Sequence, residues 1–289
     1  MCLFPIVSMV TNIDADHMDF YPNLDAIKET FLKFMNMVPF YGVNVVCGDD
    51  ENIMELIPLV KRSIITYGFK EHNTIRGEII ETGAKSKFKV FMDGEFWGEC
   101  IIGIPGIHNI LNGMGVIGVA NHFGISKEHI IRALEGFKGV GRRLEKVGEI
   151  GGVLVVDDYG HHPTEIKTTL KTIKDVYPDK RLVVAFQPHR YTRTKALFGD
   201  FCKSFGLADV LLVTEIYPAS EDPIPGVDGE SLAKGIKQLS NTNVIYCEDL
   251  TSCLLKVKEV LNPGDLLLTL GAGNIWKVGV SYVHEREEI

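Results

Sequence analysis

Residues 153–165 read Val153-Leu154-Val155-Val156-Asp157-Asp158-Tyr159-Gly160-His161-His162-Pro163-Thr164-Glu165. The first four residues are apolar and typical of a strand buried on both faces, and the polar turn after them leads into an amphipathic stretch at 164–176. Further apolar runs lie at 182–186, 210–213, 244–246 and 266–270, with helix-like stretches between them at 195–205, 229–238, 250–261 and from 274 onward. This alternation predicts a doubly wound α/β domain around a parallel sheet.

Polar residues follow several of these expected strands. They are 157–162, Gln187-Pro188-His189-Arg190, Glu215-Ile216-Tyr217 and Gly271-Ala272-Gly273-Asn274. Ligands of doubly wound sheets bind beyond the carboxyl ends of the strands, so we expect the functional site here. The carboxylates and histidines of 157–162 fit metal binding, acid–base chemistry or anion recognition, although Thr164 fits equally well as a helix cap. Arg190 and Arg193 with His189 fit an anion pocket or, alternatively, a basic helix start in solvent.

The first half of the chain has a less regular pattern. A helix is expected at 23–35, a strand at 43–47 and an antiparallel meander over 75–102, with breaks at Gly83, Asp93-Gly94 and Gly98. Helices at 106–121 and 127–134 follow. The glycine-rich segment 136–141 then introduces the second half, so we expect domains at 1–140 and 141–289.

Three further polar motifs lie in the first half or at the boundary. The stretch 11–19, Thr-Asn-Ile-Asp-Ala-Asp-His-Met-Asp, follows an apolar run and fits a divalent metal site or a polar turn. Asn109 and Asn112 lie three residues apart at an expected helix start, which suits a nucleotide or simple capping. Arg142 and Arg143 fit phosphate binding at the boundary or a solvated linker.

Composition excludes several classes of protein. The 289 residues carry 30 Lys and Arg against 38 Asp and Glu, a net charge of −8, which argues against a nucleic-acid partner. No apolar run approaches the roughly 20 residues of a membrane-spanning helix, so no membrane insertion is expected. The six scattered cysteines fit buried thiols in a reducing cytoplasm, and the N-terminus does not resemble a signal peptide. The oligomeric state is unknown from sequence.

Taken in order, these motifs resemble those of the Mur ligase family, most closely its alanine-adding branch. The strings Asp-Asp-Tyr-Gly-His-His-Pro-Thr-Glu at 157–165 and Gln-Pro-His-Arg-Tyr-Thr-Arg at 187–193 are its most specific parts, and Tyr217-Pro218-Ala219 and Pro223-Ile224-Pro225-Gly226 also match. The resemblance implies a partial central ATPase domain followed by a Rossmann-like C-terminal domain. It also implies an Mg²⁺-dependent reaction in which ATP phosphorylates the carboxylate of UDP-N-acetylmuramate and L-alanine attacks the acyl phosphate.

The resemblance also implies roles for individual residues. His17 is expected to bind Mg²⁺, and Asn109 and Asn112 to hold ATP with Arg143 and Asp158. The side chains expected to form the wall that faces the acyl phosphate and the amino acid are Tyr159, His161, His189, Arg190 and Arg193.

One departure from the family pattern concerns the phosphate loop. The sequence contains no glycine-lysine pair, whereas family members carry a Gly-x-x-Gly-Lys-Thr loop after a UDP-binding domain. We therefore expect a C-terminal portion of the ligase that is inactive alone. The alternatives are a sister ligase that adds another amino acid or peptide, and a non-catalytic fragment that binds nucleotide or UDP-sugar. A dehydrogenase is disfavoured because no G-x-G-x-x-G follows any expected strand.

Overall fold

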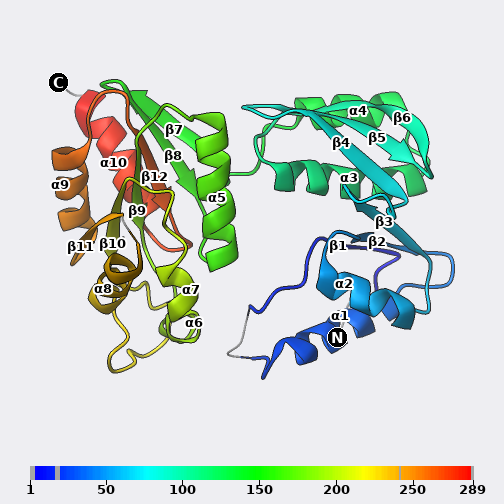
Figure 1. Ribbon diagram of the computed structural model, residues 1–289, viewed down its shortest axis with the longest axis horizontal. Coiled ribbons are helices and arrows are strands. Elements are labelled where there is room, and N and C mark those ends of the chain that lie inside the picture. The colour runs from blue at the N-terminus through cyan, green and yellow to red at the C-terminus, as the bar shows by residue number, and fades with distance from the viewer. Residues whose placement is uncertain (1–3, 17–19, 241, 288–289) are drawn as a thin grey trace. The chain divides into compact units, whose positions relative to one another are not determined.

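The computed structural model describes residues 4–16, 20–240 and 242–287. The chain folds as two compact units, residues 1–138 and 139–289, and each has its own sheet (Figure 1). Among the described residues, no helix is long and apolar enough to cross a membrane.

The first unit is built on a mixed sheet with the strand order β1-β2-β3-β4-β5-β6. Strands β1 to β4 pair in parallel, and β4, β5 and β6 form an antiparallel meander. Its elements are β1 (Val7–Val10), α1 (Leu24–Asn36), β2 (Val43–Cys47), α2 (Glu51–Leu56), a short 3₁₀ turn (Ile57–Leu59), β3 (Ile64–Gly68), β4 (Ile75–Glu81), β5 (Ser86–Met92), β6 (Glu95–Ile102), α3 (Ile107–His122) and α4 (Lys127–Gly136).

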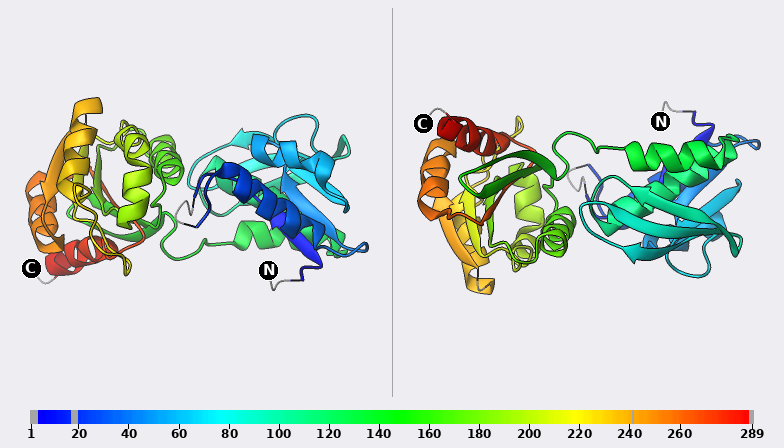
Figure 2. Two further views of the ribbon diagram at one scale, coloured as in Figure 1. Left: turned by 90° about the horizontal axis from the view of Figure 1, so that it is seen from below. Right: turned by 90° about the horizontal axis from the view of Figure 1, so that it is seen from above.

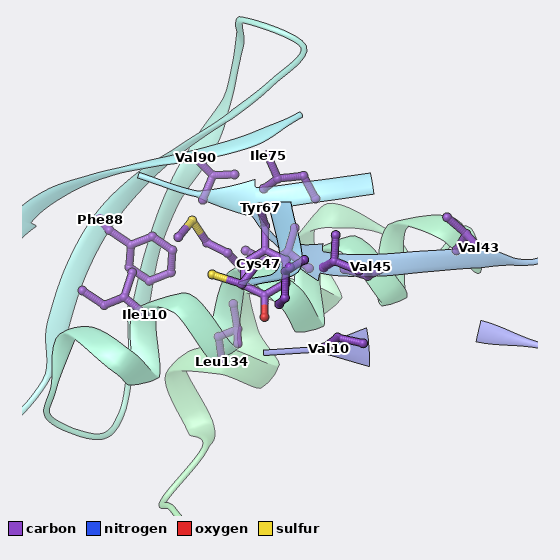
Figure 3. Close-up of a cluster of buried hydrophobic side chains, with 14 of the residues drawn as sticks. Val10, Val43, Val45, Cys47, Tyr67, Ile75, Phe88, Val90, Ile110 and Leu134 are labelled. Atoms are coloured by element: carbon purple, nitrogen blue, oxygen red, sulfur yellow. The ribbon is translucent and has the colours of Figure 1, made fainter. Parts of the chain in front are cut away.

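A single hydrophobic core lies between this sheet and its helices, and Figure 3 shows part of it. Helix α3 contributes Ile110, Met114 and Ile117 to this core. It can lie close to the strands because glycines alternate with these residues: a Cβ at Gly118 would stand 2.9 Å from Val45 Cγ1. The first turns of the same helix carry the candidate nucleotide-binding asparagines.

The sequence predicts the meander and the helices α1, α3 and α4 of this unit, but one break is wrong. Gly98 lies inside β6, where the pairing register with β5 shifts next to Val90 and Phe91. A bulge accommodates an irregular strand without ending it, so this glycine does not separate two strands. Helix α2 and strand β3 were not predicted, because both are short and neither follows a clear periodic pattern.

The second unit has the strand order β11-β10-β9-β12-β8-β7, parallel except for the antiparallel edge strand β7. Its elements are β7 (Glu145–Ile150), β8 (Val153–Asp158), α5 (Pro163–Val176), β9 (Leu182–Phe186), α6 (Tyr191–Ala196), α7 (Phe198–Cys202), β10 (Val210–Thr214), α8 (Gly229–Leu239), β11 (Asn243–Cys247), α9 (Leu250–Val260), β12 (Leu266–Leu270) and α10 (Trp276–Glu287).

Helices cover both faces of this sheet (Figures 1 and 2). Alternate residues of each strand enter two separate cores: Leu154 and Val156 pack with α5, α7 and α8, whereas Val153 and Val155 pack with α9 and α10. Burial on both faces explains the continuous apolar runs, since neither side of the strands meets water. The predicted doubly wound fold is confirmed.

Two expected elements of this unit differ from the structure. The helix expected at 195–205 is instead two short helices, because the chain becomes helical at Tyr191 and leaves helical geometry at Leu197, whose φ is −110°. Strand β7 was not predicted, since only Val147 and Ile150 of Glu145–Ile150 are apolar and the strand pairs on one side only.

Candidate active site

The carboxyl ends of β8, β9 and β10 bring four aromatic rings into one row. Tyr159 contacts His161 edge to face at 5.3 Å between ring centroids, and His161 lies 5.8 Å from His189. His189 in turn stacks on Tyr217 at 5.4 Å with an interplanar angle of 10°. The sheet thus joins residues that are nearly 60 positions apart in the sequence, as the position of the strand ends predicts.

His189 is held as a neutral imidazole. Arg193 donates from Nη1 to Nδ1 of His189 over 3.3 Å, and an arginine can only donate, so the ring proton of neutral His189 is on Nε2. Burial is the largest cause that lowers the pKa of His189 to about 4, followed by the neighbouring charges of His161, Arg193 and Arg190. At neutral pH, His189 is therefore a hydrogen-bond donor through Nε2.

The other histidine of the row is fixed by its own turn. Nδ1 of His161 lies 3.0 Å from the carbonyl oxygen of Tyr159 and 3.5 Å from a carboxylate oxygen of Glu165. Both are acceptors, which places a proton on Nδ1. Burial alone would raise the pKa of Glu165, but the backbone N–H of His161, the charge of that imidazole and the N–H of His162 together lower it.

The start of α5 is capped by His162 and Glu165, and Thr164 does not cap it. Nδ1 of His162 accepts from the backbone N–H of Thr164, and Glu165 accepts from the N–H of His162 over 3.1 Å. This is a capping box, which satisfies the free N–H groups of the first turn. Pro163 takes the first helical position, so the cap is His162, two residues before Thr164, and the proline ring has no N–H to satisfy.

The adjacent carboxylates Asp157 and Asp158 both hold the segment that precedes β7. Asp157 accepts from Nε of Arg142 over 2.9 Å and from the hydroxyl of Thr269 over 2.6 Å. Asp158 accepts from the backbone N–H of Leu144 over 2.9 Å, as well as from Gly160 and Thr169. Burial is the main cause that raises the pKa of both carboxyls.

Between these two anchors, Arg143 lies against Tyr159. Its Cζ is 5.6 Å from the centre of the Tyr159 ring, and Nη1 is 3.4 Å from a Glu165 oxygen, while the side chain remains half exposed. Arg142 is more buried and also donates to the carbonyl oxygen of Gly271 over 2.6 Å. The residue pattern alone did not distinguish these two arginines, and only the family resemblance singled out Arg143. What separates them is the hydrogen bond from Arg142 to Asp157, and only the topology of the sheet reveals that Asp157 lies there.

The glycine loop after β12 completes this edge of the sheet. The Gln187 side chain accepts from the backbone N–H of Asn274 over 2.7 Å, which ties the end of β9 to the loop. A Cβ at Gly273 would stand 2.3 Å from Oε1 of Gln187 and 2.9 Å from Tyr217, so only glycine fits there. The loop is a structural part of the edge, in which the strand ends of β9, β10 and β12 contact one another.

In the first unit, the two candidate asparagines form short-range bonds. Nδ2 of Asn109 donates to the carbonyl oxygen of Pro105 over 2.6 Å, and Asn112 lies 3.5 Å from Oδ1 of Asn109. The cap of α3 is Gly106, whose φ of 103° favours glycine and which provides no side-chain cap. Asn112 is exposed, so its amide can reach a ligand near the helix start.

The expected metal ligand His17 lies outside the described residues. Near it in sequence, the backbone N–H of Ile13 is 3.5 Å from Oδ2 of Asp50, and Asn52 donates to the carbonyl of Ile13 over 2.7 Å. Asp50 also caps α2 and has a pKa that burial raises. Within 4–16, 20–240 and 242–287, no three His, Cys, Asp or Glu side chains form a group that could hold a metal ion.

Comparison with known proteins gives two family matches. The Mur ligase middle domain matches residues 2–120, and the Mur ligase glutamate ligase domain matches residues 142–273. The chain belongs to the Mur ligase family. This confirms the resemblance inferred from the motifs; the middle-domain match lies within the first unit and the glutamate-ligase-domain match lies within the second.

Individual relatives agree with this family. UDP-N-acetylmuramate–L-alanine ligases of Oleidesulfovibrio alaskensis and Nitratidesulfovibrio vulgaris are 56% and 58% identical to it over 98% of this chain and 62% of their own length. A crystal structure of UDP-N-acetylmuramate–alanine ligase from Thermotoga maritima superposes with a TM-score of 0.79 at 28% identity, over 99% of this chain and 60% of that one. The chain thus spans about three fifths of the length of these proteins.

Proposed function

We propose that the chain serves UDP-N-acetylmuramate–L-alanine ligase activity, an ATP-dependent amide synthesis in the cytoplasm that supplies peptidoglycan precursors. The observation that carries this proposal is the set of anion-binding side chains gathered at the carboxyl edge of the second sheet. His161, His189 and Arg193 lie together there, beside Tyr159. The relatives named above support the same reaction by their identity of 56–58%.

The roles of these residues follow from their protons and charges. Arg190 and Arg193 supply permanent positive charge for the carboxylate of UDP-N-acetylmuramate and for the acyl phosphate made from it. Neutral His189 donates a hydrogen bond from Nε2 to an oxygen of the same group, because its Nδ1 already accepts from Arg193. His161 and Tyr159 extend the wall beside which the amine of L-alanine approaches the acyl carbon.

The residues proposed to hold the nucleotide are Asn109, Asn112, Arg143 and Asp158. Asn109 and Asn112 provide amides at the start of α3, and Arg143 provides a charge for a phosphate oxygen. Asp158 is also expected to act on the nucleotide, but its carboxylate already accepts three hydrogen bonds from the protein. We therefore infer that Asp158 acts on the nucleotide by holding the backbone next to Arg143.

Mg²⁺ is the expected cofactor together with ATP, with His17 as one ligand. When bound, the ion would neutralise phosphate charge during the transfer, and it would take most of its oxygen ligands from phosphate and water. The domain roles proposed are an ATP-binding domain at 1–140 and a ligase domain at 141–289. Because the 289 residues contain no glycine-lysine pair, we expect the chain alone to turn over slowly or not at all.

A chimeric protein tests this function. It joins the part of the Oleidesulfovibrio alaskensis ligase that lies outside the match to these 289 residues, and ADP release is measured with Mg-ATP and UDP-N-acetylmuramate. Release that depends on L-alanine, and not on glycine, L-serine or a tripeptide, is expected. Release with another amine would assign a sister ligase instead. A chimera that folds and binds ADP without any release would favour a non-catalytic binding role.

A further inference from the structure

The segment after β10 lies directly against the start of α6. The backbone N–H of Tyr217 donates to the carbonyl of Pro188 over 2.8 Å, and the N–H of Arg190 donates to the carbonyl of Tyr217 over 2.9 Å. Together with the ring stack on His189, these bonds align the two segments side by side. Any residue just after Tyr217 is therefore held close to the proposed anion site.

Glu221 occupies that place and caps α6 from outside the helix. The N-cap residue Arg190 has a φ of 72° and makes no side-chain cap. Glu221 instead accepts from the backbone N–H of Thr192 over 3.0 Å and from the Thr192 hydroxyl over 2.6 Å. A helix start needs such acceptors, and a carboxylate is the strongest that a protein offers.

The same carboxylate faces Arg190. Nη1 of Arg190 lies 3.7 Å from Oε1 of Glu221, and the side chains are 36% and 18% exposed, so water screens the pair only in part. Glu221 is thus an acidic residue in contact with a cluster, His189, Arg190 and Arg193, that is otherwise cationic or neutral. A negative charge in an anion site works against binding unless it orders the residues that bind.

The backbone that delivers Glu221 is strained. Ala219 and Ser220 have φ values of 48° and 70°, in the left-handed region that side chains other than glycine rarely adopt. In this region the Cβ of an L residue comes too close to the backbone, so both residues are held there against a steric cost. They turn the chain back after Pro218, whose carbonyl accepts from the N–H of Glu221 over 3.0 Å.

We propose that Glu221 is a positioning residue: it holds Arg190 and the first turn of α6, which carries Arg193, in the arrangement that binds an acyl phosphate or carboxylate. The identity of that anion rests on the proposed function. Glu221 itself does not touch the substrate. Its contribution is the fixed geometry of two arginines, which outweighs the repulsion that its own charge adds.

Anion binding separates positioning from simple electrostatics. Acetyl phosphate, a small acyl phosphate, is titrated into the protein and followed by amide and imidazole chemical shifts. If Glu221 were a bystander, Glu221→Gln would tighten binding by removing a negative charge. The proposal predicts the opposite, a Kd raised several-fold by Glu221→Gln and roughly tenfold by Glu221→Ala, which leaves Thr192 unpaired. The matched control is Asp222→Asn, one exposed residue along, which is expected to leave Kd unchanged or slightly lower.

Amide hydrogen exchange of Thr192 supplies a second readout that does not depend on the proposed function. Glu221→Ala is expected to lower protection of the Thr192 amide roughly tenfold, whereas Asp222→Asn leaves it unchanged. Tighter binding by Glu221→Gln, or unchanged Thr192 protection in Glu221→Ala, overturns the proposal. In another outcome, the wild type and Arg193→Ala both fail to bind acetyl phosphate, while Glu221→Ala still loses protection at the Thr192 amide. That outcome would contradict the proposed function and would mean that Glu221 only caps α6.

Discussion

The two candidate binding regions are built in different ways. At the start of α3, Asn109 bonds to Pro105 and Asn112 lies next to Asn109, so the polar side chains are arranged by neighbours within four positions of one another. At the carboxyl edge of the second sheet, Asp158 holds Leu144, and Gln187 holds Asn274 across 87 positions. One region is local, and the other depends on the whole fold of its unit.

This difference determines how much a polar side chain in each region contributes to the free energy of unfolding. A side chain that closes a local turn can be lost while the helix remains, because the helix is stabilised by its buried face. A carboxylate that joins distant segments inside the protein leaves several buried donors without partners when it is removed. Substitutions in the two regions should therefore differ more in the stability that is lost than in the ligand affinity that is lost.

The largest difference is expected between Asp158→Ala and Asn109→Ala. The first removes the acceptor of three buried or partly buried donors, so the free energy of unfolding of the second unit should fall by about 3 kcal/mol. The second removes one bond at a helix start and should cost about 1 kcal/mol or less in the first unit. Urea unfolding followed at resonances of each unit measures both. Equal losses would erase the proposed difference between the regions.

A smaller effect is expected at the glycine loop. Gly273→Ala places a Cβ 2.3 Å from Oε1 of Gln187, which must move and release the Asn274 N–H, so about 2 kcal/mol of stability should be lost. Gly199→Ala is the matched control, because its Cβ meets nothing within 4 Å and alanine favours the helix. Thermal unfolding of the two variants gives the answer. A Gly273→Ala protein as stable as the wild type would mean that this edge is not rigidly joined.

His189 should make the stability of the second unit depend on pH. Its pKa is lowered from 6.5 to about 4 in the folded protein, so the unfolded chain binds the proton more readily between these values. The stability contribution of neutral His189 is complete above pH 6.5 and is lost as the pH falls through 4. After allowance for partial exposure, the loss between pH 7 and pH 5 should be about 1 kcal/mol relative to His189→Asn. Urea titrations at both pH values measure it, and parallel curves for the two proteins would contradict it.

The smallest effect on stability is expected for Asn112→Ala. Its amide is exposed and its contact to Asn109 is long, 3.5 Å, so the free energy of unfolding should change by less than about 0.5 kcal/mol. If Asn112 holds the nucleotide, the affinity for Mg-ADP should nevertheless fall roughly tenfold, the loss of one well-placed hydrogen bond. Calorimetric titration measures this loss. Unchanged affinity would remove Asn112 from the proposed site.

The sequence predicts the fold where a periodic pattern is strong. Both faces of the second sheet are buried, so its strands appear as apolar runs, and the polar residues after them mark the edge where the rings meet. The pattern starts the helix at 195 and not at Tyr191, because the acceptor that caps α6 is Glu221, which lies 29 positions from Thr192 in sequence and is brought to it only by the fold. For the same reason, the residue pattern alone could not separate Arg142, which donates to the buried Asp157, from Arg143, whose side chain stays half exposed.

The contribution of Arg193 to the reaction tests the central claim most directly. L-alanine-dependent ADP release is measured for the chimera that carries these 289 residues and for its Arg193→Ala variant, with unfolding curves to confirm that both are folded. Because Arg193 is proposed to hold the acyl phosphate and to fix the proton of His189, its loss should lower kcat by roughly 100-fold or more. An Arg193→Ala protein that is folded and releases ADP at the rate of the parent would contradict the account.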